Sequence, residues 1–371
     1  MKKLSAILVS VVLGAVLMTG CGAKQAGTQA EPEPTSTEQE QSSVESEQTS
    51  VEQEQSSAEP EQTSTEPAET TAEPVTVNVV ALKGPTAMGM VDFMDKVDTG
   101  ELTDNNYHFE IVAAVDEVTP RLVQGQADIA AVPANLASVL YNNTEGGVEV
   151  LAVNTLGVIY IVESGDTVSG ISDLIGKTIY ASGKGATPEY ALNYILTQNG
   201  IDPENDLTIE WKSEHAECLS ALMAEENAIA MLPQPFVTTA QTKSDRIRVA
   251  LDLTEEWDKL GTDSALLTGV VVARKDFVAS NPDAVAAFME HYETSVKFVN
   301  ENVEDAAALI EKYDIVPAAV AVKAVPNCNI VFVTGDEMKQ KLSGYLAVLL
   351  EQNPKSVGGA LPADDFYYIK E

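Results

Sequence analysis

The feature that most constrains this chain is an alternation of β-branched strands with helices that occurs twice between residues 75 and 232. Strands that alternate with helices predict a largely parallel sheet with helices on both faces. About 300 residues follow position 74, a size at which one hydrophobic core usually divides into two. The sequence therefore predicts an α/β fold with two lobes. The first run has strands at 75–82, 107–114, 129–132 and 148–153, and helices at 85–94, 120–124 and 135–141; the second has strands at 177–181, 207–211 and 228–232, and helices at 188–199 and 214–224.

Two extended apolar segments, at 156–163 and 267–274, are typical of the paired crossings that join two lobes. We therefore expect lobe 1 to comprise 75–157 and 267–371, and lobe 2 to comprise 158–266. Bending of a few residues in the crossings would let the lobes hinge.

The part after the second crossing is expected to be helical. Asn281 is a suitable N-cap before Pro282 at the first helical position, and apolar residues then recur at helical spacing. We expect that stripe in the core: Val285, Phe288, Met289, Tyr292, Val296 and Val299.

The N-terminus has the pattern of a secretory signal. Lys2 and Lys3 precede an uncharged apolar run, and small residues lead directly to Cys21. This ending resembles the lipobox of bacterial lipoproteins, which implies removal of residues 1–20 and lipidation of Cys21; an ordinary signal with a chance cysteine is the alternative. Two acyl chains suffice for stable anchoring. We expect an extracytoplasmic protein anchored to the cell membrane by lipid.

Residues 21–74 are predicted to be a disordered acidic linker behind that anchor. The segment is rich in Glu, Ser, Thr, Gln and Pro, lacks aromatic residues, and repeats Glu-Gln-Glu-Gln-Ser-Ser at 38–43 and 52–57. Such a composition buries too little apolar surface to fold. The formal net charge of the whole chain is −35, without a basic stripe, which argues against nucleic acid as a partner.

Cysteine and histidine usage predicts no metal site and no cofactor. Beyond Cys21 only Cys218 and Cys328 remain, so one disulfide is possible, although two buried free thiols are the preferred interpretation. The three histidines are scattered, and no cysteine and histidine cluster occurs.

Four motifs, in order along the chain, resemble those of substrate-binding proteins of ABC importers for nitrate, sulfonate, taurine and thiamine precursors. They are Gln-Gly-Gln-Ala-Asp-Ile-Ala at 124–130, the segment from Ser-Asp-Leu-Ile-Gly-Lys to Thr-Pro-Glu-Tyr at 172–190, Leu-Pro-Gln-Pro-Phe-Val at 232–237 and Ser-Asn-Pro-Asp-Ala-Val at 280–285. The resemblance implies a type II periplasmic-binding fold, a small solute bound between the lobes, and a permease and an ATPase as partners. We expect a monomer.

Positions that match the family's ligand-contacting segments are the candidate site. From lobe 1 they are Lys83, Gly84, Thr86, Met88, Asn135, Ala137, Asn154 and Thr155, and from lobe 2 they are Gly185, Thr187, Glu189, Gln234 and Phe236. Lys83 could pair with an anion, Asn135 and Asn154 could donate hydrogen bonds, and Phe236 could stack on a ring. The alternatives are a solvated lysine, an asparagine that satisfies backbone groups, and a core phenylalanine.

Three turn sequences indicate helix N-termini at the carboxyl edges of the strands, where open parallel sheets bind ligands. They are Gly84-Pro85-Thr86, Thr119-Pro120 and Thr187-Pro188. Free backbone N–H groups there favour an anionic or strongly polar ligand group, although ordinary capping explains any one of them. Gln234 stands where the family often has Glu, and the loops supply no arginine cluster. An anion, a neutral heteroaromatic and a singly charged organic solute therefore all remain open.

An enzyme on the same fold is the competing interpretation, because thiamine-pyrimidine synthases and a menaquinone-pathway dehydratase resemble this architecture. The pair Glu214-His215 could transfer a proton. However, no nucleophile, base and orienting group cluster in the sequence, and the signal indicates export. We expect a receptor and not an enzyme, and an adhesin or sensor without a transport partner also remains open.

Overall fold

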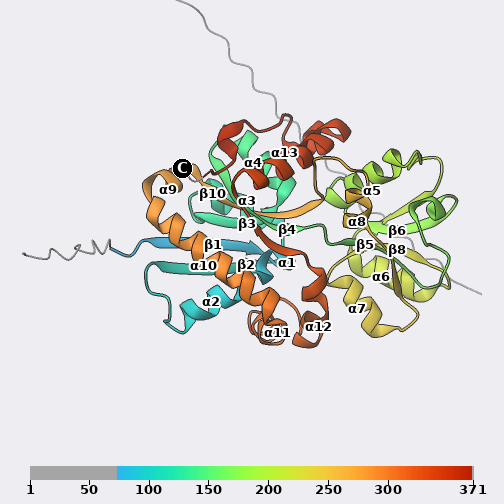
Figure 1. The fold of residues 1–371 in the computed structure, drawn as a ribbon, viewed down its shortest axis with the longest axis horizontal. Helices are drawn as coiled ribbons and strands as arrows, with labels where there is room; N and C mark the ends of the chain where they lie inside the picture. Colours follow the sequence, from blue (N-terminus) through green and yellow to red (C-terminus); the bar gives the residue numbers. More distant parts are fainter. Residues whose placement is uncertain (1–72, 370–371) are drawn as a thin grey trace, which may run out of the picture. The chain divides into compact units, whose positions relative to one another are not determined.

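Two β-sheets, each flanked by helices, organise the computed structural model, which describes residues 73–369 (Figure 1). The six-stranded sheet, in the order β11-β4-β10-β3-β1-β2, and its helices form lobe 1. The five-stranded sheet, in the order β7-β6-β8-β5-β9, and its helices form lobe 2. The strands of lobe 1 are β1 (Thr76–Leu82), β2 (Asn106–Val112), β3 (Ile129–Pro133), β4 (Val148–Leu156), β10 (Leu267–Arg274) and β11 (Ile330–Val333). Those of lobe 2 are β5 (Ile159–Glu163), β6 (Thr178–Ser182), β7 (Thr208–Lys212), β8 (Ile229–Pro233) and β9 (Arg248–Asp252).

Five strands of each sheet share one topology, to which lobe 1 adds β11 as an antiparallel edge strand. In lobe 1, β1 pairs in parallel with β2 and β3, and β10 lies antiparallel between β3 and β4. In lobe 2, β6 pairs in parallel with β7 and β8, and β5 lies antiparallel between β8 and β9. Four strands of each sheet run in one direction; the reversed strands are β5 in lobe 2, and β10 and the edge strand β11 in lobe 1. The prediction of an α/β fold with mostly parallel sheets is confirmed.

The helices follow the strands as expected, with two corrections. The helix expected at 85–94 is interrupted at Gly89, where Tyr292 and Ile330 approach closely. The helix expected to open at Pro120 begins five residues earlier, because Glu117 caps the backbone N–H of Ala114. The helices of lobe 1 are α1 (Pro85–Met88), α2 (Val91–Asp98), α3 (Val115–Val123), α4 (Ala134–Asn143), α9 (Lys275–Ser280), α10 (Pro282–Glu301), α11 (Val303–Lys312), α12 (Ala318–Ala324) and α13 (Gly335–Gln352). Those of lobe 2 are α5 (Thr187–Gln198), α6 (His215–Ala224), α7 (Phe236–Lys243) and α8 (Leu253–Asp258).

The chain crosses between the lobes twice. The first crossing is Gly157-Val158, between β4 and β5, and the rest of the segment expected at 156–163 belongs to these two strands. The second lies at 259–266, after α8, and not at 267–274 as expected. Residues 267–274 form β10, an inner strand of the first sheet whose two faces are both covered. Its apolar run therefore reflects complete burial rather than a passage between lobes.

A continuous apolar core links the lobes on the side of α13. One cluster of buried side chains contains residues of both sheets together with α8 and α13. Within it the Trp257 ring lies 4.5 Å from that of Tyr194 and 5.9 Å from that of Tyr345. A second cluster lies under α10, where Val285, Phe288, Tyr292, Val296 and Val299 are buried and Met289 is partly buried, so the predicted stripe is confirmed.

The signal sequence, Cys21 and nearly all of the linker lie outside the described residues, so those predictions stand as predictions. Between residues 73 and 369, no helix combines the length and the apolar character needed to cross a membrane.

Candidate functional site

The carboxyl ends of the parallel strands in the two sheets point toward each other. Because β4 leads directly into β5, β5 runs away from lobe 1. Strands β6 and β8 lie in the same sheet as β5 and run in the opposite direction, so they run toward lobe 1. Strands β1 and β3 run with β4 toward lobe 2. Ligands of open α/β sheets bind outside these carboxyl ends. We call them the facing edges, and they bring together loops from both halves of the chain.

The facing edge of lobe 1 contains a buried hydrogen-bonded group around Asn154, which is 1% exposed. Its Nδ2 donates to the backbone carbonyl of Thr86 (3.2 Å), and its Oδ1 accepts from Oγ1 of Thr155 (3.1 Å). Oγ1 of Thr86 donates to the carbonyl of Leu82 (2.7 Å). An added Cβ at Gly269 would lie 2.5 Å from both Asn154 Oδ1 and Thr86 Cγ2. These three predicted residues lie together, and their side chains bond to one another and to the backbone.

The other predicted residues of lobe 1 differ in exposure. Met88 and Ala137 are completely buried. Gly84 is half-buried with φ 130°, a conformation that favours glycine, at the start of α1. Asn135 is half-buried, and its Nδ2 donates to the carbonyl of Ser356 (3.3 Å). Gly84 and Asn135 are therefore more accessible than the two apolar residues.

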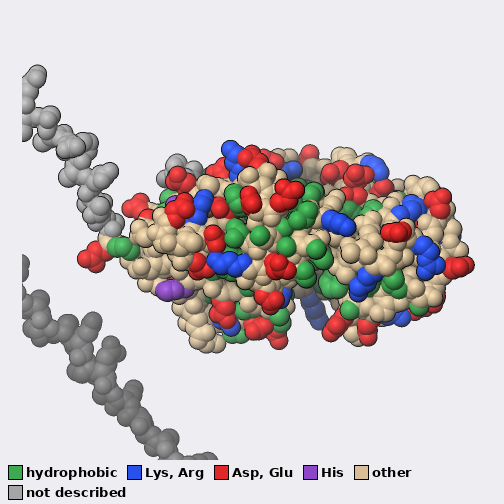
Figure 2. Space-filling model, turned by 90° about the horizontal axis from the view of Figure 1, so that it is seen from below, with side chains coloured by type: hydrophobic (Ala, Val, Ile, Leu, Met, Phe, Trp, Pro, Cys, Tyr) green, Lys and Arg blue, Asp and Glu red, His purple; other side chains and the backbone are tan. Residues whose placement is uncertain are grey.

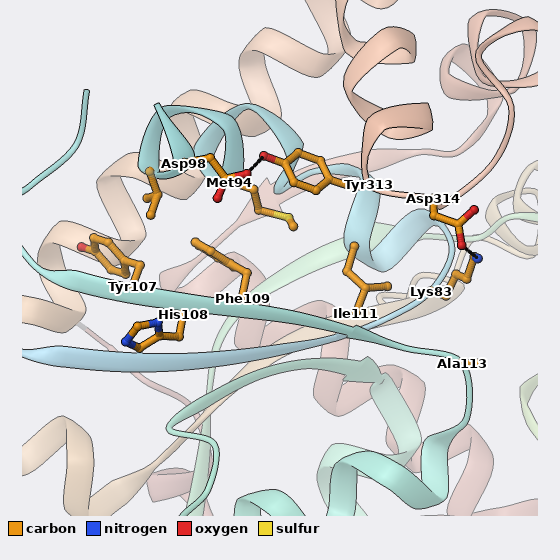
Figure 3. Close-up of a pocket in the computed structure, with 11 residues that line it drawn as sticks. Lys83, Met94, Asp98, Tyr107, His108, Phe109, Ile111, Ala113, Tyr313 and Asp314 are labelled. Atoms are coloured by element: carbon orange, nitrogen blue, oxygen red, sulfur yellow. Dashed lines mark hydrogen bonds and ion pairs between the residues drawn. The ribbon is translucent and has the colours of Figure 1, made fainter. Parts of the chain in front are cut away.

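Lys83 lies at one end of a cavity of about 670 Å³ within lobe 1 (Figure 3). Its Nζ is 3.2 Å from Oδ2 of Asp314. The wall includes Phe109 of β2 and Tyr313, whose hydroxyl donates to Asp98 (2.7 Å). Every residue that lines this cavity belongs to lobe 1, and the charge of Lys83 is paired there.

The facing edge of lobe 2 begins with the loop between β6 and α5. Gly185 has φ +78° and is exposed, and its N–H donates to Oε2 of Glu189 (2.5 Å). Thr187, 7% exposed, bonds through Oγ1 to the hydroxyl of Tyr345 in α13 (3.0 Å). The loop is therefore held by its own carboxylate and by a contact from lobe 1.

Two residues outside the predicted binding site join this edge, one of them the His215 that the sequence offered only for proton transfer. Oγ of Ser182, at the end of β6, lies 2.5 Å from Nδ1 of His215, at the start of α6. The His215 ring lies 5.1 Å from that of Phe236, which begins α7 and is half-buried. Burial lowers the pKa of His215, so the imidazole is neutral at neutral pH. Ser182 ends β6 and His215 begins the helix after β7, as Thr187 begins the helix after β6.

Gln234 is nearly buried between β8 and α7. Its Oε1 accepts from the backbone N–H (3.3 Å) and Oγ1 (2.9 Å) of Thr238. The side chain therefore caps α7, while Phe236 is the more exposed of the two predicted residues in this segment.

Direct contacts join the two lobes on both sides of the crossings. On one side α12 packs against α7, and on the other α13 packs against α5 (Figure 1). The hydroxyl of Tyr160 donates to the carbonyl of Asn327 (2.9 Å), and Nδ2 of Asn329 donates to the carbonyl of Gly157 (2.5 Å). Two sheets that share a five-strand topology, two crossings and facing carboxyl edges define a two-lobed solute-binding protein.

A family model described as ABC transporter, phosphonate, periplasmic substrate-binding protein matches residues 100–322. The chain belongs to this family, and the prediction of an ABC substrate-binding protein is confirmed. The matching model is the phosphonate one, whereas the motifs resembled the nitrate and sulfonate receptors. A comparison with curated proteins finds no match.

Solved structures give the same fold. An ABC transporter protein from Parabacteroides distasonis is 22% identical with a TM-score of 0.68, over 80% of this chain and 99% of that one. The periplasmic aliphatic sulphonate binding protein SsuA from Escherichia coli is 16% identical with a TM-score of 0.63, over 77% and 96%. The alkanesulfonate-binding SsuA from Xanthomonas axonopodis pv. citri, bound to MOPS, is 14% identical with a TM-score of 0.57, over 79% and 96%. The periplasmic-binding fold of this chain is thereby established, and it functions as the substrate-binding component of an ABC import system outside the cytoplasm.

Proposed function

We propose that the chain binds a small solute between its facing edges and delivers it, chemically unchanged, to the permease and ATPase of one importer. The observation that carries this proposal is the opposed direction of the two sheets, which brings the loops after β1, β3, β6 and β8 to one place. A solute held there contacts both lobes, so it favours the conformation in which they are close.

The proposed contact residues are the accessible members of the two edges. In lobe 1 these are Lys83, Gly84 and Asn135, and in lobe 2 Gly185 and Phe236, to which we add His215. Thr86, Asn154, Thr155 and Thr187 are proposed to shape the edges through their hydrogen bonds. Met88 and Ala137 belong to the buried cores, and Glu189 and Gln234 cap α5 and α7.

A receptor without catalytic activity fits the Ser182 and His215 pair better than an enzyme does. A serine nucleophile beside a histidine base is an arrangement that catalysis uses. Here the Ser182 side chain belongs to a residue only 2% exposed, so its hydroxyl is not presented to a substrate. We therefore propose that Ser182 and His215 contribute to the shape and polarity of the facing edge of lobe 2 and do not catalyse a reaction.

We further propose that Cys21 carries the lipid anchor and that the binding part acts as a monomer. Replacing Cys21 with Ser should release the protein from the membrane fraction while the folded part keeps its melting temperature. Unchanged membrane retention of the Cys21→Ser protein would contradict the anchor.

The proposed function is tested by recovering the ligand. Purified protein is incubated with the small molecule that raises its melting temperature most, and both are analysed by mass spectrometry and small-angle scattering. Recovery of the intact molecule, with a smaller radius of gyration for the complex, supports the receptor. Recovery of a chemically altered molecule would identify an enzyme.

A further inference from the structure

The imidazole of His215 is held through one ring nitrogen and one ring face. It begins α6, after β7, and is half-buried at the facing edge of lobe 2. Its Nδ1 lies 2.5 Å from Oγ of Ser182, the last residue of β6, and its ring lies 5.1 Å from that of Phe236, the first residue of α7. Between residues 73 and 369, no hydrogen bond involves Nε2 of His215. Three elements therefore fix this ring and leave one nitrogen for another partner.

The hydroxyl of Ser182 is the donor in the bond to His215. The residue is only 2% exposed, and Nδ1 is the one nitrogen or oxygen atom of the described residues that bonds to its Oγ. If Nδ1 donated to Oγ, the hydroxyl hydrogen of Ser182 would have no nitrogen or oxygen acceptor, and an unsatisfied buried donor is costly. If the hydroxyl donates to Nδ1, both groups are satisfied.

The thiol of Cys218 supports the same direction. Burial raises the pKa of this completely buried thiol, and its hydrogen bond with Ser182 opposes that effect only in part, so the thiol is protonated at neutral pH. A protonated thiol is a weak donor and its sulfur a weak acceptor. Oγ of Ser182 can accept from the thiol while its hydroxyl donates to Nδ1, so that each hydrogen of this buried group has an acceptor.

The remaining proton of the His215 ring therefore lies on Nε2. Burial lowers the pKa of His215, so the ring is neutral at neutral pH and carries a single N–H. In a neutral imidazole, a nitrogen that accepts a hydrogen bond leaves the proton on the other nitrogen. Because Nδ1 accepts from Ser182, the nitrogen without a protein partner is the one that carries the proton.

We infer that Ser182 is a positioning residue of the binding site, whose hydroxyl holds His215 in the tautomer that presents Nε2–H to an acceptor oxygen of the solute. This inference rests on the proposed function and adds a requirement for the solute. A carbonyl or oxyanion oxygen can accept from Nε2–H, whereas a solute with only donor groups at that place leaves the N–H unpaired and is bound more weakly.

Nitrogen NMR of histidine tests the tautomer directly. The chain has three histidines; His108 of β2 and His291 of α10 belong to lobe 1, where histidine side chains are visible at the end away from lobe 2 in Figure 2. The protein is labelled with 15N at histidine and measured at mildly alkaline pH, where the rings are neutral, and His215→Gln identifies the signals of His215.

The expected spectrum shows Nε2 of His215 as the protonated nitrogen. In Ser182→Ala both ring nitrogens are expected to shift toward the values of a mixture of tautomers, which a merely structural role of Ser182 would not produce. A proton on Nδ1 of His215 in the unmodified protein would overturn the inference and leave the proposed function intact.

Affinity for a solute tests the effect of Ser182 on binding. The probe is the compound isolated from a bacterial small-molecule extract by the rise that it causes in the melting temperature. Ser182→Ala is expected to weaken its binding by roughly three- to tenfold, the effect of one hydrogen bond, and Ser182→Thr, which keeps a hydroxyl, to retain most of the affinity. Ser164→Ala is the matched control, because it removes a buried hydroxyl that has no hydrogen-bond partner among the described residues and lies after β5, at the opposite edge of lobe 2.

Saturation with the same compound is expected to move the Nε2 signal of His215 and to leave the signals of His108 and His291 in place. Unchanged His215 signals, or equal affinities of Ser182→Ala and Ser164→Ala, would overturn the inference. If no compound of the extract raised the melting temperature, the proposed function itself would be contradicted, and the inference with it.

Discussion

The two lobes share a five-strand sheet topology, but the residues at their facing edges differ in hydrogen bonding and exposure. In lobe 1 the edge is closed by bonds among Thr86, Asn154 and Thr155, with Gly269 packed directly behind them. In lobe 2 the edge leaves Gly185 exposed and Phe236 and His215 half-buried. Lobe 1 therefore has a rigid, internally bonded group beside its accessible Lys83 and Asn135, whereas lobe 2 presents an aromatic ring and an imidazole at its edge.

The opposite edges are alike in the two lobes. Each has a buried carboxylate bonded to an arginine: Asp128 with Arg274 (2.9 Å) in lobe 1, and Glu163 with Arg248 (2.7 Å) in lobe 2. Asp128 also accepts from the backbone and side chain of Asn78 at 2.9 Å each.

The largest expected effect is on the stability of lobe 2. In Arg248→Ala the completely buried Glu163 loses its charged partner, and an uncompensated buried charge should lower the free energy of unfolding by about 3 kcal/mol. Arg246→Ala, two residues away and exposed, is the control and should change it little. Chemical denaturation measures both, and equal stabilities would show that the pair contributes nothing to lobe 2.

A smaller effect is expected where lobe 1 is packed most tightly. Gly269→Ala places a Cβ against Asn154 and Thr86 and should destabilise the protein by about 1–3 kcal/mol, as overpacking does. Gly170→Ala is the control, because its added Cβ meets no atom within 4 Å and its φ is extended. If Gly269→Ala unfolded at the same denaturant concentration as the control, the rigidity assigned to this group of lobe 1 would be wrong.

Removing one interlobe hydrogen bond should have a still smaller effect. Tyr345→Phe leaves the ring packed near Trp257 but removes the Tyr345 hydroxyl that donates to Oγ1 of Thr187. The free energy of unfolding should fall by about 1 kcal/mol. Ligand affinity should fall with stability, since the bond holds the start of α5 against α13. A lower melting temperature with unchanged affinity would indicate that this contact does not position the edge of lobe 2.

No effect on binding is expected from the acidic linker. Deleting residues 24–72 should leave the melting temperature and the affinity unchanged, because its composition provides no apolar face for contact with the lobes. Calorimetry of the truncated and full-length proteins measures both. A melting temperature lower by several degrees would indicate that this segment stabilises the folded part.

Local sequence patterns predicted the helices and strands well, but they could not predict contacts between residues that are distant in sequence. The stripe of α10 follows from helical periodicity, and the alternation of strands and helices specifies parallel sheets. From the same patterns we predicted a crossing at 267–274, where the structure has the buried strand β10, because a run of apolar residues is typical of both a buried strand and an interlobe crossing. The pairing of Ser182 with His215, 33 residues apart, and of Thr187 with Tyr345, 158 apart, depends on the tertiary fold. Strand-end positions could have added His215 to the candidate site, whereas nothing local indicated Tyr345.

The central claim, that one solute contacts both facing edges, is tested most directly by hydrogen exchange with mass spectrometry. The stabilising compound is added at saturating concentration, and exchange is followed in peptides that cover 83–88 in lobe 1 and 183–187 in lobe 2. Slower exchange in both peptides, with little change at the opposite edges around Asp128 and Glu163, is the predicted result. Protection confined to the peptides of a single lobe would contradict the claim.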